Sequence, residues 1–544
     1  MKIKFILIII LTTFIFQGCD DQLEISQNDN ITSENLYNTP SGALAGLAGV
    51  YSRVVLVYRD AVINAQYPTN STDEGHYNRK GIKNILKNNF TASEPLLRNI
   101  WGTYYEGVSA ANTLLVGLEN SSLEEGVKQE FLAEAHFLRA FLFFDIQRAF
   151  GGIEGIPMPT EETNKQLLPR TPGIDVYKQI VSDLEFAEQY LPSAGESIAG
   201  RANKSAARGL LARAYLYMAS QPFNEEGAYE KSRDWSKKVI DDSYHQLNSS
   251  YEDIFNQLGM GNYETKEMLF QIGFSFANLD SNQSSKLGSA FGMKIDDEGC
   301  GKGYALTYAT IPLIQKYRSD PTDERGFWNT YPYFNKRNND CQLSVINNQF
   351  IYPASKYRRN LEPNNTNSSY GPHHWPVLRF SDMLLMYAEA ENKLNPGSGL
   401  ALNAVNRVRN RAKATPLTAI DDTSIQEERL LELCFEGHRK YDLVRWGILE
   451  EKVNETKNIM ETLAANTNFI NDDWTSYGEP NLGPDGIPES GDEPSSRNIR
   501  KNALHASFNY FDGYNDFDAS KHYILPIPEQ ELGVNTNLKQ TIGW

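Results

Sequence analysis

The chain has 544 residues, which fits either two or three ordinary domains or one large body with a single core. Apolar residues make up 40% and charged residues 22%, so the chain can bury a core and is not disordered. Acidic residues outnumber basic ones by 69 to 52, and the formal charge of −17 argues against binding to nucleic acid or to anionic lipid through a basic patch. A mean hydropathy of −0.49 excludes a polytopic membrane protein.

Residues 1–18 have the pattern of an export signal. Lys2 and Lys4 precede an uncharged apolar run over 5–16, which is shorter than the roughly 20 residues that a membrane-spanning helix needs. The run ends in glycine and Cys19, an ending similar to the lipobox of bacterial lipoproteins, in which the cysteine is acylated and becomes the new N-terminus. Two or three acyl chains would anchor the protein stably to a membrane. Loss of the two lysines would leave a formal charge of −19.

Three further cysteines remain in the mature chain. Cys300 and Cys341 lie in a loop-rich stretch, and whether they pair stays open. Cys434 falls on the apolar face of a predicted helix, where we expect a buried free thiol.

Apolar residues recur at helical spacing from residue 39 to about residue 242. The start signals predict helices that begin at Thr39, Ser93, Ser122, Thr171, Asn203 and Ala228. Ser122 with Glu125 is typical of a capping box. Each pair of helices spans about 30 to 50 residues, which resembles the helix-turn-helix repeats of the tetratricopeptide kind.

The helical signal fades between residues 263 and 375, where Gly, Asn, Pro, Ser and Tyr dominate. A loop-rich segment of this length predicts a functional region. Helices are expected again over 381–394, 400–412 and 424–449, and the last opens on a predicted Ser424–Glu427 capping box. Residues 466–500 are rich in Asn, Pro, Gly and acid and predict an extended surface loop.

A search for catalytic motifs finds no HExxH, CxxC pair, GxSxG or Walker loop. The pair His373 and His374 would need further ligands to hold a metal, so loop contacts are the favoured interpretation. The acidic stretch 512–518 lacks the spacing of a helix-loop-helix calcium site, and a solvated loop is favoured there, with calcium left open. Asp73 and Glu74 form a carboxylate pair of the kind that a glycosidase uses, which is weak evidence among 69 acids.

The segment EERLLELCFEGHRKYDLVRWG interleaves opposite charges with leucines at spacings of three and four. Its charged residues are Glu428, Glu432, Glu436, Arg439, Asp442 and Arg445. Such a cluster fits either an active site or a structural network of ion pairs. We expect the structural network.

Several segments together resemble the SusD/RagB family, the surface lipoproteins of Bacteroidetes nutrient-uptake systems. They include ALAGLAGVYSRV near residue 43, WGTYYEGVSAANTLL over 101–115, AEAHFLRAFLFFDIQRAFGGIEGIPMP over 133–159 and NKSAARGLLARAYLYMAS. The second half adds PVLRFSDMLLMYAEAEN over 376–392, ALNAVNRVRNRA, the charged segment and the C-terminal LPIPEQELGVNTNLKQTIGW. Together, in this order and at this spacing, the segments are spread over nearly the whole chain.

The resemblance implies a mostly α fold, a single large SusD-like domain of tetratricopeptide-like helix pairs with a loop-rich ligand-binding face. It divides the chain into a signal peptide (1–18), an N-terminal half (19–250) and a C-terminal half (251–544) with long loops at 263–375 and 466–515. It also implies a lipid anchor at Cys19, display on the outer face of the outer membrane, and a SusC-like TonB-dependent barrel as partner. The expected function is capture of a nutrient, most often a glycan, without catalysis and without a cofactor or metal.

The ligand residues are expected on loops, because sugars bind to aromatic faces flanked by amide and carboxylate groups. Two regions fit. The candidates are Tyr67, Asn70, Asp73 and Tyr77 in the first, and Trp328, Tyr331, Tyr333, Tyr370, His374 and Trp375 in the second. The resemblance adds Trp101, although its place on an apolar helical stripe favours core packing.

Two alternatives to a glycan importer subunit stay open. One is a peptide-binding relative, because the RagB branch of the family handles peptides. The other is a lipid-anchored glycoside hydrolase that uses Asp73 and Glu74 as its acid pair.

Overall fold

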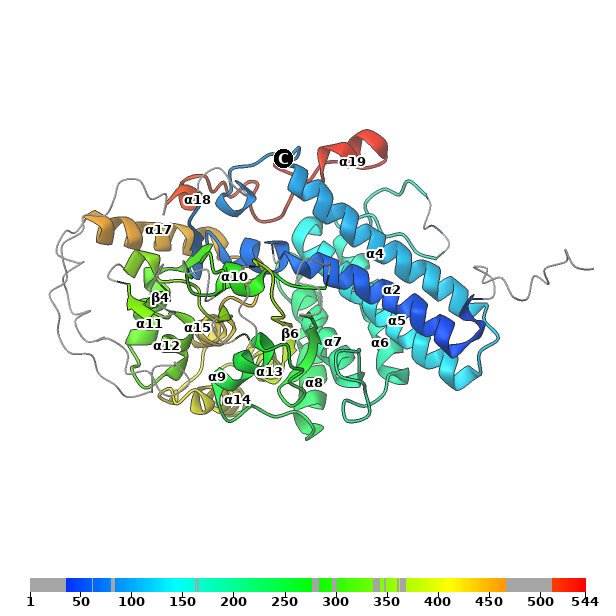
Figure 1. Cartoon of the computed structure of the whole chain (residues 1–544), viewed down its shortest axis with the longest axis horizontal. Coiled ribbons are helices and arrows are strands. Elements are labelled where there is room, and N and C mark those ends of the chain that lie inside the picture. Colours follow the sequence, from blue (N-terminus) through cyan, green and yellow to red (C-terminus); the bar gives the residue numbers. More distant parts are fainter. Residues whose placement is uncertain are drawn as a thin grey trace, which may run out of the picture.

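The computed structural model describes residues 36–60, 62–79, 84–161, 163, 166–275, 283–295, 301–335, 343–346, 349–359, 362, 368–465 and 511–544. Within these residues the chain is mostly helical, and its short strands pair in twos. Long helices of the first half stack on one side of the molecule, while short helices and strands from the middle of the chain gather on the other (Figure 1). The mostly α fold that the sequence predicts is confirmed.

The long helices of the first half follow their sequence signals closely. They are α2 (Pro40–Arg59), α4 (Pro95–Glu119), α5 (Glu125–Ile146), α6 (Gly173–Tyr190), α7 (Lys204–Ala219) and α8 (Ala228–Asp241). Thr39 caps α2, because its side chain accepts a hydrogen bond from the amide of Gly42. Asn203 caps α7 in the same way through the amide of Ala206. These two local signals therefore set the starts of their helices, whereas α4 and α6 begin one residue later than caps at Ser93 and Thr171 require, with Glu94 and Pro172 at the N-cap positions.

The predicted capping box at Ser122 and Glu125 is wrong. The Ser122 amide donates to the side chain of Asn38, and Glu124 caps α5 instead. The helix therefore starts two residues later than a cap at Ser122 requires, because a contact from another segment takes the Ser122 amide.

Successive helices pack on one another in chain order. α4 lies against α5, α5 against α6, α6 against α7 and α7 against α8, while α2 packs on both α4 and α5. After the middle of the chain, α13 (Phe380–Leu394) returns to pack on α8, and α14 (Gly399–Arg411) and α15 (Asp422–Leu433) pack on α13. This is the stacking of helix pairs that the sequence spacing predicts.

Among the described residues, α2 alone is long and apolar enough to cross a membrane by length and composition. Its buried face, which includes Leu47, Val50, Val54 and Tyr58, packs on α4 and α5. A core helix presents such a face, so length and composition are weak evidence of a membrane span here.

The loop-rich middle holds short elements. They are α9 (Tyr251–Gly259), β2 (Met268–Ile272), α10 (Leu287–Phe291), β3 (Thr307–Ala309), α11 (Ile311–Arg318), α12 (Glu324–Asn329), β4 (Tyr333–Asn335), β5 (Leu343–Val345) and β6 (Trp375–Arg379). β1 (Gly75–Tyr77) pairs with β3, β2 with β6 and β4 with β5, all antiparallel. The first of these pairs joins the segment near residue 75 to the middle of the chain, because Gly75 faces Ala309.

The charged segment is two helices instead of the single helix predicted over 424–449. α15 ends at Leu433 and α16 (Arg439–Trp446) follows. Phe435 and Gly437 between them have φ of +64° and +78°, and a side chain at Gly437 would collide with the carbonyl oxygen of Asn64. This left-handed turn breaks the helix.

The capping box predicted from Ser424 and Glu427 is also wrong. Asp421 is the N-cap of α15, and Ser424 is its N3 partner in the box. Ser424 therefore takes part in the cap, but three positions further into the helix than predicted.

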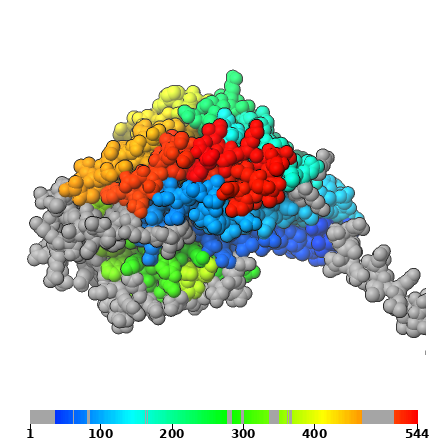
Figure 2. All heavy atoms as spheres, turned by 90° about the horizontal axis from the view of Figure 1, so that it is seen from above, coloured from blue at the N-terminus to red at the C-terminus, as the bar shows by residue number. Residues whose placement is uncertain are grey.

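The C-terminal segment 511–544 covers the chain that leads into α4. It carries α18 (Asp512–Asn515) and α19 (Glu529–Val534) and follows α17 (Leu449–Ala465) after residues outside the described ranges. Figure 2 shows it in red over the blue chain near residues 84–100. The Asn88 side chain donates to the carbonyl of Gly513, and the rings of Phe90 and Trp544 lie 4.8 Å apart. The segment is therefore an integral part of the body.

The acidic residues of 512–518 have other partners in this arrangement. Asp512 forms an ion pair with Lys87, and Asp516 accepts from Asn89. Within the described ranges, no group of three or more His, Cys, Asp or Glu side chains could hold a metal ion.

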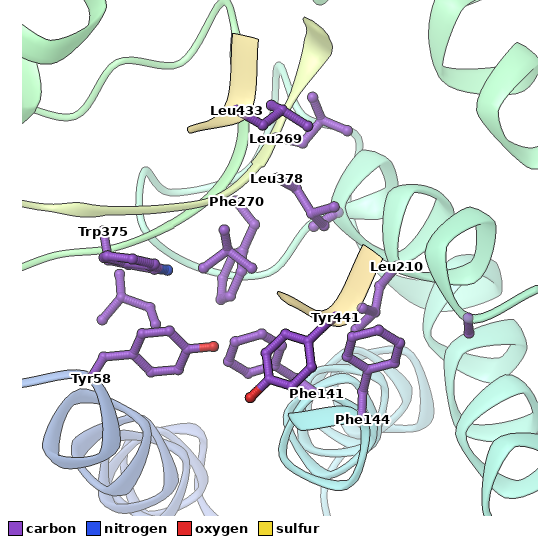
Figure 3. Close-up of a cluster of buried hydrophobic side chains, with 14 of the residues drawn as sticks. Tyr58, Phe141, Phe144, Leu210, Leu269, Phe270, Trp375, Leu378, Leu433 and Tyr441 are labelled. Atoms are coloured by element: carbon purple, nitrogen blue, oxygen red, sulfur yellow. The ribbon is translucent and has the colours of Figure 1, made fainter. Parts of the chain in front are cut away.

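An aromatic core joins the two halves. Tyr58 of α2, Phe141 of α5, Phe270 of β2 and Trp375 of β6 meet there (Figure 3). The ring centroids of Tyr58 and Trp375 lie 5.9 Å apart, and those of Phe141 and Phe270 lie 5.7 Å apart. Because strands from the middle of the chain supply half of these rings, the loop-rich region and the helix stack share one core.

Candidate ligand-binding face

The predicted first region, residues 67–77, is buried. Tyr67 is 2% exposed, and the ammonium group of Lys440 lies 4.0 Å from its ring centroid. Asn70 donates to the carbonyl of Gln66 and to the hydroxyl of Thr307. Tyr77, in β1, is 3% exposed. Contact of these side chains with a ligand stays a prediction, but the exposure that it assumed is wrong.

Asp73 and Glu74 are both buried and face different partners. Both carboxylate oxygens of Asp73 accept from Arg439, at 2.8 and 2.6 Å. Oε1 of Glu74 accepts from the hydroxyl of Thr69 and from the amide of Phe435. Burial raises the pKa of Glu74 to about 8. The pair therefore has the geometry of a buried structural contact.

The three aromatic residues at 328–333 are buried as well. Trp328, in α12, is 3% exposed and donates through Nε1 to the carbonyl of Lys356. The guanidinium carbon of Arg358 lies 3.7 Å from the Trp328 ring centroid and 3.9 Å from that of Tyr331. Tyr333 is in β4, with its ring centroid 4.9 Å from that of Tyr331. The guanidinium group of a buried arginine thus lies over the rings of Trp328 and Tyr331, against which the prediction placed a ligand.

His374 and Trp375 lead into and begin β6, respectively, and both are buried. Nε2 of His374 faces the carbonyl of Phe274, and its ring lies 4.5 Å from that of Tyr263. Trp375 stacks on Tyr357 with centroids 6.1 Å apart. The sequence predicts both residues on an exposed loop. The structure instead places them in the interior, so that prediction is wrong.

Trp101 lies in α4 and is 4% exposed. Its ring centroid is 4.7 Å from that of Tyr105 and 5.2 Å from that of Phe150. This is the packed position that its helical stripe favours.

Tyr370 is the candidate that the structure leaves partly exposed. Arg59 and Lys286 both approach its ring, with the guanidinium carbon 5.1 Å and the ammonium nitrogen 4.8 Å from the centroid. Arg59 also donates to the Tyr370 hydroxyl over 2.9 Å. Asp60 completes the group by pairing with Lys286 at 2.6 Å. We call these four residues the Tyr370 cluster.

Backbone contacts bring the cluster together from three parts of the chain. Arg59 is the last residue of α2, and its carbonyl accepts from the amide of Lys286, the residue before α10. Ser285 and Gly371 exchange both of their backbone hydrogen bonds, which places Tyr370 next to α10. The positions of the side chains therefore follow from the fold.

The cluster combines a tyrosine ring, two cations and a carboxylate, all partly exposed. The exposed fraction is 45% for the side chain of Asp60 and 34% for that of Lys286. Burial lowers the pKa of Lys286, but hydrogen bonds to Asp60 and Tyr370 outweigh it, so the net pKa is raised. The group can donate to and accept from the hydroxyls of a polar ligand.

Sequence reasoning missed Arg59, Asp60 and Lys286. No spacing links them to Tyr370, because more than 200 residues separate Asp60 from Lys286. A basic residue at the end of an apolar helix is an ordinary C-terminal signal, so nothing in the sequence indicated that Arg59 belongs to a binding site.

The charged segment forms the structural network that the sequence predicts. Glu432 pairs with Arg379 at 2.9 Å and Arg325 at 3.1 Å, and it also pairs with Arg411. The remaining members pair inside the protein too: Glu428 with Arg325 and Arg409, Glu436 with Arg379 and Lys356, Arg439 with Asp73, and Asp442 with Arg429 and Arg445. These side chains are buried and joined to several elements, which fits a structural role.

Cys434 is a buried free thiol, as predicted, although it lies at the C-terminal cap of α15. Burial raises the pKa of its thiol to about 12. The predictions for Cys19, Cys300 and Cys341, and for the surface loop 466–500, concern residues outside the described ranges.

The stacked helix pairs and the partly polar face beside them define an α-helical repeat protein with a candidate ligand-binding surface. Two family models match such a chain: one described as the SusD family over residues 324–544, and one described as starch-binding, associating with the outer membrane, over residues 25–216. The chain belongs to the SusD-like family.

Curated relatives match most of the sequence. A SusD-like protein of Bacteroides ovatus is 25% identical, over 88% of this chain and 86% of its own length. SusD-like protein P25 of Formosa agariphila is 26% identical, over 84% of this chain and 92% of its own length.

Solved structures share the fold over nearly the whole chain. A SusD homolog from Bacteroides thetaiotaomicron has a TM-score of 0.79 at 22% identity and covers 95% of this chain and 100% of its own. A laminarin-binding SusD-like protein has a TM-score of 0.65 at 20% identity, with coverages of 93% and 99%. A structure with a xylogluco-oligosaccharide has a TM-score of 0.63 at 22% identity, with coverages of 93% and 96%.

Proposed function

We propose that this protein is a surface lipoprotein that binds an oligo- or polysaccharide and delivers it to a SusC-like TonB-dependent outer-membrane transporter. Membership of the SusD-like family supports the proposal. Two proteins of the same fold are described with laminarin and with a xylogluco-oligosaccharide, and one matching family model is described as starch-binding. The ligand of this chain is therefore sought among glycans first.

The Tyr370 cluster is the proposed contact surface for the glycan. The observation that carries this assignment is that Tyr370 is partly exposed, unlike the other predicted ligand residues, and lies beside Arg59, Lys286 and Asp60. An aromatic ring packs against the C–H faces of a sugar, while charged groups beside it bind the hydroxyls. The other predicted ligand residues are buried, so they would reach a glycan only if the surrounding side chains moved.

The N-terminal sequence supports the proposed lipid anchor. An export signal over residues 1–18 that is followed by Cys19 supports acylation of that cysteine, and the acyl chains would be the protein's own contact with the membrane. The description of one family model as associating with the outer membrane agrees with this. We propose that the folded body faces the cell exterior, where a SusC-like barrel can receive the ligand.

We propose binding without catalysis. Asp73 and Glu74, the acid pair of the hydrolase alternative, are buried and held by Arg439, Thr69 and the amide of Phe435. A glycosidase needs one carboxylic acid and one carboxylate on either side of an accessible bond. The burial of both groups argues against that role.

Affinity gel electrophoresis tests the proposal. Laminarin, xyloglucan or starch in the gel should retard the wild-type protein, and Tyr370→Ala should reduce the retardation at least tenfold in apparent affinity. Tyr190→Ala is the matched control, because Tyr190 is 38% exposed at the end of α6. Equal retardation of Tyr370→Ala and wild type would remove the cluster from the site. Retention of peptides in place of any glycan would favour the peptide-binding alternative.

A further inference from the structure

A buried arginine contacts the chain segment that carries Tyr370. Arg359 is 1% exposed, and its guanidinium group reaches the backbone at three places. Nη1 donates to the carbonyl of Lys302 over 2.8 Å and also to the carbonyl of Ser368. Nη2 donates to the carbonyl of Tyr370 over 3.1 Å. Through these contacts Arg359 holds the backbone of Tyr370 and leaves the ring to the other members of the cluster.

Glu362 fixes the guanidinium group in this place. Nε and Nη2 of Arg359 donate to the two carboxylate oxygens of Glu362, both over 2.8 Å. Burial raises the pKa of Glu362, but His373 and Arg359 outweigh burial, so the net pKa is lowered and the carboxyl group is ionised at neutral pH. A two-point ion pair of this kind sets the orientation of the planar guanidinium group as well as its position.

The five N–H donors of Arg359 are all used. A guanidinium group carries these donors in one plane, and here two of them meet the Glu362 carboxylate while three meet backbone carbonyls. A lysine has its donors on a single atom and cannot make the same set of contacts. Arginine at this position is therefore matched to the backbone that it holds.

Close packing extends these contacts to the helix that follows Lys286. A Cβ added at Gly288, in α10, would come within 2.8 Å of Cγ of Arg359. A Cβ added at Gly371, the residue after the tyrosine, would come within 2.4 Å of Oε1 of Glu362. The pair of Arg359 and Glu362 therefore packs against both segments that supply the cluster with its tyrosine and its lysine.

We propose that Arg359 is a positioning residue of the glycan-binding surface, which holds the backbone at Tyr370 so that the ring is in place before a ligand arrives. A surface that is already ordered loses less conformational entropy on binding. This inference rests on the function proposed for the Tyr370 cluster, because Arg359 is buried and acts on a ligand only through Tyr370.

Hydrogen exchange tests the positioning without any ligand. The amides of Ser285 and Gly371 each donate to the carbonyl of the other residue, over 2.9 and 2.8 Å, so both report on the order of this segment. In Arg359→Gln we expect both amides to exchange at least tenfold faster, relative to amides in the core helix α5. Arg325→Gln removes another buried guanidinium group and should leave that ratio unchanged. An unchanged ratio in Arg359→Gln, or unprotected amides in wild type, would overturn the proposal.

Polysaccharide affinity gels test the role in binding. Arg359→Gln should weaken the apparent affinity at least fivefold, and the double variant with Tyr370→Ala should bind no more weakly than Tyr370→Ala alone. Two residues that act through one contact have non-additive effects, whereas a general loss of stability would add to the effect of Tyr370→Ala. Wild-type affinity in Arg359→Gln, or additive losses in the double variant, would refute the positioning role.

If Arg359→Gln fails to fold, Glu362→Gln takes its place in both tests. It keeps the size of the side chain and removes the charge that fixes Arg359, so we expect the same changes, with a rise in exchange of at least threefold. Unchanged exchange in that variant would overturn the proposal as well. A wild-type protein that binds no polysaccharide, but shows the expected exchange, would count against the glycan-import function and not against the ordering of Tyr370 by Arg359.

Discussion

The backbone amide of Phe435 donates a hydrogen bond to Oε1 of Glu74 over 2.5 Å, although the two residues lie 361 positions apart. Phe435 stands in the left-handed turn that separates α15 from α16. The same oxygen of Glu74 accepts from the hydroxyl of Thr69. A buried carboxyl from the first part of the chain therefore holds the turn that breaks the charged segment.

The burial of Glu74, which raises its pKa more than the hydrogen bonds from Thr69 and Phe435 lower it, predicts a pH dependence of stability. The pKa of Glu74 is about 8 in the folded protein and 4.5 in the unfolded chain, so the folded state binds the proton more tightly. The stabilising contribution is complete below pH 4.5 and is lost as the pH rises through 8. In Glu74→Gln, which keeps a neutral acceptor, we expect this loss to shrink by a few kcal/mol over that range.

Urea unfolding at pH 5, 7 and 9 measures the effect. Glu455→Gln is a suitable control, because Glu455 is exposed on α17 and pairs only with Lys452 among the described residues. Parallel stability profiles for wild type and Glu74→Gln would show that Glu74 ionises normally in the fold, contrary to our expectation.

Glu432 should be one of the most sensitive positions in the protein. Its carboxylate meets Arg379, Arg325 and Arg411 in the interior. Burial alone raises its pKa, but the three guanidinium groups outweigh burial and hold the pKa far below its usual range. Removing one partner of a buried ion pair leaves uncompensated charge and costs about 3–5 kcal/mol. We expect a loss of that size in Glu432→Gln.

The acid limb of the stability curve checks the same network. Because the folded pKa of Glu432 is depressed, its contribution is present above pH 4.5 and is lost as the pH falls. The wild-type protein should therefore lose stability on acidification more steeply than Glu432→Gln. The exposed pair of Glu455 with Lys452 should contribute less than about 1 kcal/mol. A Glu432→Gln variant as stable as Glu455→Gln would contradict the structural role of the network.

Much of the helix stack could be predicted because its signals are local. Thr39 and Asn203 cap helices within their own sequence neighbourhood, and each cap is where the pattern indicates. The break at Phe435 could not be predicted in this way, because it depends on Glu74 and on the approach of Gly437 to Asn64. Helix periodicity continues through such a turn in the sequence.

The candidate site was less predictable, because it too depends on contacts between residues far apart in the sequence. The residues around Trp328 in the sequence have the composition of a surface loop, yet the side chain of Arg358 covers the Trp328 ring. Tyr370 was among the predicted residues, but Lys286 and Arg59 reach it from distant parts of the chain. Sequence composition finds aromatic residues, while their exposure is decided by long-range packing.

Trp375 and Tyr370 should separate stability from ligand binding. Trp375 packs between Tyr58 and Tyr357 in the core, so Trp375→Ala should cost about 3–5 kcal/mol in the free energy of unfolding. Tyr370 is partly exposed, and its contacts with Arg59 and Lys286 are worth roughly 0.5–1 kcal/mol each at such a site. Thermal unfolding should therefore show a large drop in Tm for Trp375→Ala and a small one for Tyr370→Ala.

Ligand binding should rank the same two variants in the opposite order. Below its lowered Tm, Trp375→Ala should still be retarded by the glycan, because the ring faces the core and not the Tyr370 cluster. A Trp375→Ala variant that is folded, as stable as wild type and unable to bind glycan would contradict this expectation. The Trp375 ring would then belong to the glycan-binding site.

Cys19→Ala should release the protein from membranes. The acyl chains expected on this cysteine are the proposed anchor, and each buried CH₂ contributes about 0.8 kcal/mol to membrane binding. Without them, a body with a formal charge of −19 after removal of the two signal-peptide lysines has no electrostatic attraction to an anionic lipid surface.

Fractionation of cells that express Cys19→Ala should find the variant in the soluble fraction instead of the membrane pellet. Cys434→Ser, which changes a buried free thiol, should stay in the pellet. Because a SusC-like barrel could also retain the protein, the decisive comparison uses cells that lack the partner; continued sedimentation of Cys19→Ala there would rule out a lipid anchor as its sole attachment.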